Sequence, residues 1–210
     1  MNYAALSTAI QDYTENRETT FVAHIPDFVK AAEKRVYNDA ELPVLRKNAT
    51  GTISASNQYL TLPSDWLATN SLAVIASGLQ QYLINKDVEY IREAYPDVTY
   101  TGTPKYYAQF NVNTVILGPT PDIGYTAELH YFYYPESIVT ASTTWLGDNY
   151  DFVLLYGALR EASQYMLQEP DIVANYEKMY QDSLAKLALQ SKGKLRRDTY
   201  RSMQSRAEIT

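Results

Sequence analysis

Hydrophobic positions near the start of the chain follow the spacing of amphipathic helices. The first predicted helix covers residues 2–14, where apolar side chains recur every three or four positions. A second is predicted from Pro26, a residue that suits a first helical turn, to about residue 40. The start of the chain is therefore expected to be a pair of helices.

The helical period returns after residue 145. A long helix is predicted to begin with Asp148 or Asn149 as its N-cap and to end before Pro170. Another is predicted from Asp171 to about Gly193, a residue that often ends helices. Because few residues join them, these two helices are expected to form an antiparallel hairpin.

The residues between the helical ends have the short alternating runs of β-strands. A hairpin is predicted to join residues 104–111 to 114–121. The turn at residues 56–57 predicts another hairpin, between the first two strands near residues 50–55 and 58–62. A short helix is predicted over residues 87–96. Further strands are expected near residues 50–55, 58–62, 70–76, 80–84 and 125–134.

The last of these strands, "ELHYFYY", is dense in aromatic residues. Its two faces both carry rings, so we expect both to be covered, one by the β core and the other by helices or a neighbouring subunit. Glu128 and His130 are then interpreted as edge or interface groups, not as a catalytic pair.

The order of elements predicts an α+β fold. We expect an antiparallel helical bundle from the N- and C-terminal helices, with an inserted antiparallel β region. The predicted divisions are N-terminal helices (1–42), a β region with one short helix (43–140), a C-terminal helical hairpin (141–190) and a basic extended arm (191–210).

Composition excludes several classes of site. The chain has 210 residues and no cysteine, so disulfides and thiolate sites are excluded. Its first residues lack the pattern of a signal peptide, and no apolar run approaches the ~18 residues of a membrane span. Tyrosine is abundant, with 20 Tyr against 5 Phe and 2 Trp, which favours half-buried surfaces such as subunit interfaces.

Charge is unevenly distributed along the chain. Residues 186–206 contain seven basic side chains and one acidic one, a net charge of +6, whereas the whole chain carries −6. The remainder therefore carries −12. A basic end on an acidic body predicts an acidic partner, protein or nucleic acid, with a solvated end as the alternative.

No pattern of catalytic or metal-binding residues is present. There is no glycine-rich phosphate loop, and His24 and His130 are far apart with no second ligand at helical spacing. Asp148 and Asp151 fit the start of a helix, while Glu161 needs a partner if it is buried. We therefore expect no enzyme activity, metal or cofactor.

Several segments together resemble a known family. They are "LPSDWL" (62–67), "TGTPKYY" (101–107), "VILGPTPDIGYTAELHYFYYPESI", "DNYDFVLLYGALREASQYM" and "NYEKMYQDSLAKL". In this order, over roughly residues 1–190, they resemble the head-to-tail adaptor (connector, or neck) proteins of tailed bacteriophages.

The resemblance implies a structural protein of the virion neck, assembled in the host cytoplasm. Such proteins form rings, commonly of twelve copies, beneath the portal. They extend the DNA channel, through which DNA passes without sequence-specific binding, and offer an attachment surface to a tail, tail-nozzle or terminator protein. The resemblance implies neither a cofactor nor a membrane partner.

The resemblance also implies that the C-terminal segment docks onto the portal protein. The candidate docking residues are Lys192, Lys194, Leu195, Arg196, Arg197, Tyr200, Arg201, Met203 and Arg206. Aromatic side chains beyond those that one core needs suggest contacts between subunits. The candidates are Tyr131, Tyr133, Tyr156, Tyr165, Tyr176 and Tyr180.

Two alternative functions remain open from the residues. A glycan-binding module would use exposed coplanar rings, with Tyr131, Tyr133, Trp66 and Trp145 as stacking platforms. A nucleic-acid-binding module would use the basic end of the chain, and its affinity would fall steeply with salt.

Overall fold

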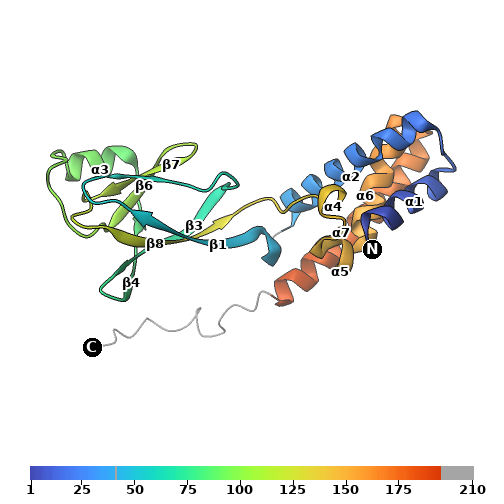
Figure 1. Cartoon of the computed structure of the whole chain (residues 1–210). Coiled ribbons are helices and arrows are strands. Elements are labelled where there is room, and N and C mark those ends of the chain that lie inside the picture. The colour runs from blue at the N-terminus through green and yellow to red at the C-terminus, as the bar shows by residue number, and fades with distance from the viewer. Residues whose placement is uncertain (41, 195–210) are drawn as a thin grey trace. The chain divides into compact units, whose positions relative to one another are not determined.

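The computed structural model describes residues 1–40 and 42–194, without the side chains of residues 191–194. The chain divides into two compact units. The helical unit takes the described residues up to Leu45 and from Pro135 onward, and the β unit takes Arg46–Tyr134. Each unit is described by itself below, and Figure 1 labels their elements.

The helical unit is organised around α6. This helix packs against α1, α2, α5 and α7, and most of its side chains between Val153 and Ser163 are buried. The unit comprises α1 (Tyr3–Thr14), α2 (Thr19–Asp39), a 3-10 turn (Pro43–Leu45), α4 (Ile138–Ala141), α5 (Trp145–Asn149), α6 (Asp151–Tyr165) and α7 (Pro170–Lys194).

A glycine allows three of these helices to approach closely. A Cβ at Gly157 would lie 3.0 Å from Cβ of Ala32 on α2 and 3.3 Å from the ring of Tyr180 on α7. Contacts this short leave no room for a larger side chain. The close packing of α2, α6 and α7 therefore depends on Gly157.

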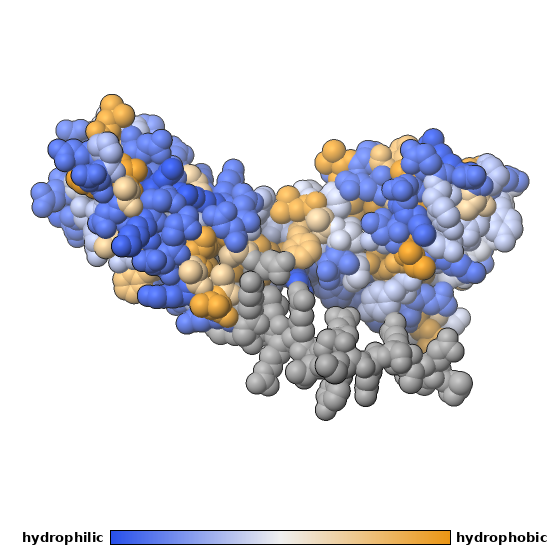
Figure 2. Space-filling model, turned by 180° about the vertical axis from the view of Figure 1, so that it is seen from behind, coloured by the Kyte–Doolittle hydropathy of each residue, from blue (hydrophilic) through white to orange (hydrophobic). Residues whose placement is uncertain are grey.

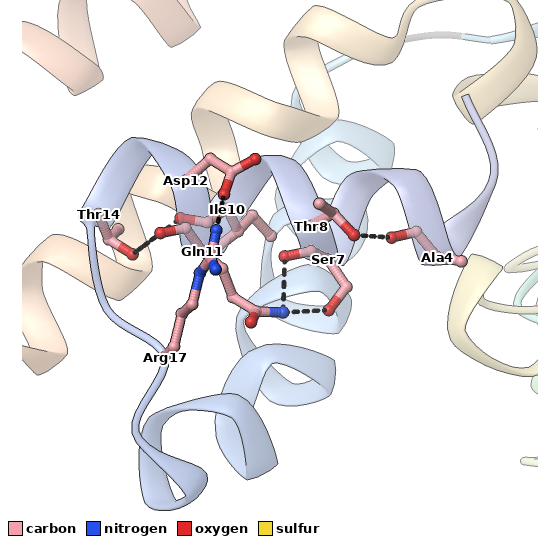
Figure 3. Close-up of polar contacts among 8 residues, drawn as sticks. All are labelled: Ala4, Ser7, Thr8, Ile10, Gln11, Asp12, Thr14 and Arg17. Carbon is pink, nitrogen blue, oxygen red and sulfur yellow. Dashed lines mark hydrogen bonds and ion pairs between the residues drawn. The ribbon is translucent and has the colours of Figure 1, made fainter.

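The polar side of α1 is held by bonds within the helix and at its end (Figure 3). Thr8 donates to the carbonyl of Ala4, and Thr14 donates to that of Ile10. Arg17, in the turn that follows, forms an ion pair of 2.9 Å with Asp12. Leu6 and Ile10 are buried, as the predicted helix over residues 2–14 requires.

Helix α2 begins at Thr19, so the predicted start at Pro26 is wrong. Phe21 and Ile25 are fully buried and extend the apolar stripe ahead of the proline. Pro26 removes one backbone hydrogen bond from the helix. The free energy gained by burying Phe21 and Ile25 outweighs the loss of that hydrogen bond.

The β unit consists of two four-stranded sheets. The first, in the order β1-β8-β3-β4, is antiparallel and contains β1 (Arg46–Ile53), β8 (Tyr125–Phe132), β3 (Ala68–Ala76) and β4 (Leu79–Tyr82). The second has the order β2-β7-β6-β5 and contains β2 (Tyr59–Thr61), β7 (Thr114–Gly118), β6 (Tyr106–Asn111) and β5 (Ile84–Asn85).

One hydrophobic core joins the two sheets. It contains Leu72 and Leu129 from the first sheet and Tyr107 and Leu117 from the second. Helix α3 (Val88–Ala94) covers β6 and β7 of the second sheet and buries Ile91 there. The β unit therefore has a core of its own.

The structure corrects the predicted architecture, although the mixed α+β class fits. The predicted antiparallel helical bundle with one inserted antiparallel β region is wrong. The strands form two sheets, and β5 pairs with β6 in parallel. The described residues contain seven α-helices, of which α4 and α5 are single turns and α3 lies among the strands.

The predicted hairpin between the first two strands is also wrong. β1 pairs with β8, whereas β2 pairs with β7 in the other sheet. Ser56, with a φ of 60°, lies in the connection, which carries the chain from one sheet to the other. The hairpin of β6 and β7 is confirmed.

Candidate protein interaction surface

A network of charged side chains joins three helices of the helical unit. Arg35 on α2 donates to Glu177 on α7 over 2.7 Å. Arg160 on α6 donates to Glu161 over 2.6 Å, which supplies the partner that Glu161 was expected to need. Nε of Arg160 also lies 3.3 Å from Oε2 of Glu177. These two atoms form an ion pair, but their geometry is not that of a hydrogen bond.

The network keeps Glu177 ionised. Desolvation alone would raise the pKa of Glu177, but hydrogen bonds from Gln181 and Arg35 and the charge of Arg160 outweigh it. The pKa of Glu177 is therefore lowered. The side chain remains a charged acceptor among the helices at neutral pH.

Tyr180 lies beneath the network and is fully buried. Its ring carries the guanidinium of Arg35 at 4.7 Å, and its hydroxyl donates to Asp39 over 3.3 Å. Burial raises its pKa, so the phenol stays protonated as a donor. Tyr180 thus acts as an internal link between α7 and α2.

A pocket of about 670 Å³ opens beside this network. Four buried polar atoms of its lining residues have no hydrogen-bond partner: Nη1 of Arg35, Nε of Arg160, Oε1 of Gln168 and Oε2 of Glu177. Two of them, Nε of Arg160 and Oε2 of Glu177, form the ion pair described above, so the pocket lining is held partly by charge and not by hydrogen bonds. The lining residues are Arg35, Arg160, Gln164, Leu167, Gln168, Pro170, Val173, Ala174 and Glu177.

Leu167 is one of the residues that line this pocket, and it lies in the turn between α6 and α7. Its side chain is 90% exposed, and its backbone has a φ of 52°. The left-handed conformation is unfavourable for a leucine by about 1–2 kcal/mol. The N–H of Leu167 donates to the carbonyl of Gln164 and the N–H of Gln168 donates to that of Ser163, and this cap at the end of α6 offsets the cost.

Exposed apolar side chains gather elsewhere on the same helical unit. Tyr165 lies near the pocket end of α6, whereas Phe152 and Tyr156 stack on each other near its start, with ring centroids 6.1 Å apart. Figure 2 shows hydrophobic residues among hydrophilic ones on the surface of each unit. The helical repeat places Tyr156 and Tyr165 about 180° apart around α6.

The predicted interface tyrosines fall into two groups. Tyr131 and Tyr180 are 1% and 0% exposed, so each is packed inside its own unit. Tyr165 is exposed, and partly exposed side chains are found for Tyr133, Tyr156 and Tyr176. Only this second group offers surface to another subunit.

In the β unit, Tyr131 belongs to a polar cluster at the end of β8. Its hydroxyl donates to Asp65 over 2.9 Å, and Lys47 donates to the same carboxylate over 2.7 Å. The hydrogen bond from Lys47 lowers the pKa of Asp65, and Tyr131 adds to the effect. The ring of Tyr133 is tilted by 60° from that of Tyr131, so the two form no coplanar platform for a glycan.

Only one face of β8 is covered within the β unit. Tyr125, Ala127 and Leu129 are buried with Tyr131, whereas the alternate residues are at least partly exposed. On that second face Glu128 accepts hydrogen bonds from Asn48 and Gln80, and His130 lies 3.5 Å from it. Within the β unit this second face is not covered, so the expectation that helices or a neighbouring subunit cover it stays a prediction.

The turn between β3 and β4 presents another exposed group. Ser77 and Gly78 have φ values of 51° and 78°, as a tight hairpin turn requires. All four residues of β4 are exposed, and Leu79 is 68% exposed. β4 pairs only with β3, so its outer edge is free within the described residues.

The proposed docking arm lies almost entirely outside the described residues. Lys192 and Lys194 belong to the last turn of α7, but their side chains are not described. The other candidates, Leu195, Arg196, Arg197, Tyr200, Arg201, Met203 and Arg206, fall outside the described residues.

Sequence reasoning missed the pocket residues. Arg35, Gln168 and Glu177 come from distant parts of the chain, and no motif links them. A signal was available at Leu167, because a leucine in a short turn before Pro170 has little chance of burial. Within residues 1–40 and 42–194, no group of three metal-ligating side chains occurs and no helix has the length and hydropathy to cross a membrane.

Comparison with known proteins gives a match over nearly the whole chain. A family model described as SU10 adaptor protein matches residues 1–207. No curated protein matches the chain. The family match confirms the predicted resemblance to bacteriophage adaptors, whose role is structural. The chain therefore belongs to the SU10 adaptor protein family of bacteriophage virion proteins.

Proposed function

We propose that this protein is a head-to-tail adaptor that forms a ring beneath the portal of a tailed phage. The ring, commonly of twelve copies in such adaptors, extends the DNA channel and offers the surface to which the tail attaches. Membership of the adaptor family supports this role. The remaining support comes from the exposed surfaces of the protomer.

The single observation that carries the proposal is the pair of exposed aromatic surfaces on opposite sides of α6. A closed ring needs two different complementary faces on each subunit. Tyr165 contributes to one such surface, and the stacked Phe152 and Tyr156 form another. Contacts between unlike surfaces of successive copies then close the ring.

Charge supports a second part of the proposal. The chain carries −6 in total while residues 186–206 carry +6, so the body is strongly acidic. An acidic channel repels DNA phosphates and lets the duplex slide without being bound. Residues 191–210 form the arm that docks onto the portal protein.

The test is assembly with the portal protein of the same phage, followed by electron microscopy of the product. We expect rings of the full chain on the portal. Phe152→Ser should weaken ring formation, whereas Val112→Ser, which changes an exposed residue of the β6–β7 turn, should not. A chain lacking residues 191–210 should fold but fail to attach. Attachment without those residues would exclude the arm.

A further inference from the structure

We propose that the free edge of β4 pairs with the free edge of β1 in a second copy of this chain. This contact joins the first sheets of successive copies into one continuous antiparallel sheet. The inference rests on the proposed ring, and it adds a contact in the β unit to those proposed for the helical unit.

The first sheet ends in two strand edges that no other strand covers. Within the described residues β1 pairs only with β8, and β4 pairs only with β3 (Figure 1). Neither edge strand contains a proline or a bulge, and β4 has no charged side chain. In β1 the charges are confined to Arg46 and Lys47 at its start. Exposed edges are normally shielded by such features, so these two edges are suited to strand addition.

The free hydrogen-bonding groups of β4 can be assigned residue by residue. Leu83, which follows the strand, donates its N–H to the carbonyl of Leu72 over 2.8 Å. In an antiparallel pair the backbone groups of alternate residues point to the partner strand. Gln81 therefore bonds to β3, whereas Gln80 and Tyr82 direct their N–H and C=O groups to the open edge.

The same alternation, followed across the sheet, assigns the free groups of β1. Ala73 of β3 directs its backbone groups away from β4, so it bonds to Glu128 of β8. Glu128 then has no backbone groups left for Thr50, which lies opposite it on β1. Thr50 therefore directs its N–H and C=O groups to the open edge, and so do Asn48 and Thr52, two positions away on either side.

The two edges match in strand direction and in the faces that they continue. All neighbouring strands of this four-stranded sheet are antiparallel, so a copy placed edge to edge in the same orientation presents β1 antiparallel to β4. The edge residues Tyr82 and Thr50 lie in the same row as Glu128, so their side chains share its face. Pairing between these edge residues joins like faces of the two copies. An odd number of strands would fail on both counts.

The contact also has the symmetry that a ring requires. β1 and β4 are different edges, so the contact between successive copies is heterologous and its repetition can close a ring. A closed ring leaves no free edge in the first sheet, as in a closed barrel. Leu79 and Tyr82 are 68% and 62% exposed, and a neighbouring strand would cover part of both side chains.

Hydrogen exchange of the full chain tests both edges in one experiment. The free protein is compared with rings assembled on the portal protein, and amide exchange is followed by mass spectrometry. Exchange in the peptides over residues 48–53 and 79–84 should slow by about tenfold or more in the ring, as for amides that gain a hydrogen bond. The turn around Val112, which is 75% exposed, is the control and should exchange equally in both states.

Each outcome of the exchange experiment decides between the hypotheses. Slower exchange at both edges supports the pairing. Unchanged exchange at both edges overturns it. Slower exchange at one edge alone overturns it as well, because that edge then has an occupant other than a second copy. Failure of the full chain to form rings contradicts the proposed function instead.

A matched pair of variants separates the backbone from the side chain. Gln80→Pro removes an N–H that points to the open edge and keeps the bonds to β3, so it should weaken the contact between copies by about tenfold. Gln80→Ala keeps this N–H and loses only the side-chain bond to Glu128, so it should form rings like the natural chain. Ring yield is measured by mass photometry, and equal yields from the two variants overturn the pairing. If thermal unfolding shows that Gln80→Pro does not fold, the exchange experiment decides.

Discussion

Glu33 offers the sharpest test of how the helical unit is held together. This carboxylate is 3% exposed on α2 and accepts a hydrogen bond of 2.8 Å from the backbone N–H of Ile138. The hydroxyl of Ser137 bonds to it as well. These bonds tie the start of α4 to α2 across 105 residues of sequence.

Replacing Glu33 by alanine should destabilise the helical unit by about 2–3 kcal/mol. A hydrogen bond to a charged group contributes about 1.5–3 kcal/mol, and the substitution leaves the buried N–H of Ile138 without a partner. The substitution also removes the free-energy cost of burying a carboxylate, and this offsets part of the lost stability. For a chain of this length the midpoint of thermal unfolding should fall by about 4–10 °C.

Glu33→Gln separates the hydrogen bond from the charge. Desolvation raises the pKa of Glu33 above its ordinary 4.5, although its hydrogen bonds and Lys30 oppose the shift. When folding raises the pKa of a carboxyl group, the resulting stabilisation is complete at pH values below the pKa of the unfolded chain. It is lost as the pH rises through the pKa of the folded protein. The natural chain should therefore gain stability as pH falls toward 4.5, and Glu33→Gln should lose that part of the gain.

The assay is thermal unfolding followed by circular dichroism at several pH values. Asp182→Ala is the matched control, because it removes an exposed acid from a helix of the same unit and should change stability by less than about 0.5 kcal/mol. Glu33→Ala with the stability of the control would refute the role of this hydrogen bond. An unchanged pH profile in Glu33→Gln would refute the assigned pKa shift.

Three further predictions follow from the packing and charges. Pro26→Ala should restore a backbone bond in α2 and raise stability by up to about 3 kcal/mol, measured by chemical denaturation. Gly157→Leu should lower it by about 1–3 kcal/mol, because even a Cβ would meet Ala32 at 3.0 Å. Because the pKa of Asp65 is lowered, the stability that it contributes is lost as pH falls; Lys47→Ala should flatten this loss in an acid titration.

Local patterns in the sequence predicted the elements whose partners are also local. Helix α1 and the hairpin of β6 and β7 depend on spacing within a few residues and on the turn at residues 112–113. The pairing of β1 depends on β8, whose residues follow about 80 positions later, as in the bond between Asn48 and Glu128. Strand pairing at such separation leaves no local signal, so the predicted arrangement of sheets failed.

The start of α6 shows a missed signal of a different kind. The helix was expected to begin with Asp148 or Asn149 as its cap, but these residues belong to α5. The hydroxyl of Thr144 accepts from the N–H of Gly147 and caps that earlier turn. Tyr150 then separates α5 from α6. Threonine at an N-cap is a recognisable signal, so this boundary was within reach of sequence reasoning.

The interface was the hardest part to predict, because tyrosine is used here for two different purposes. Tyr180 and Tyr165 lie on consecutive helices, yet one is buried beneath Arg35 and the other is exposed at the end of α6. Helical spacing places a ring on a face but does not say whether another helix of the same chain covers that face.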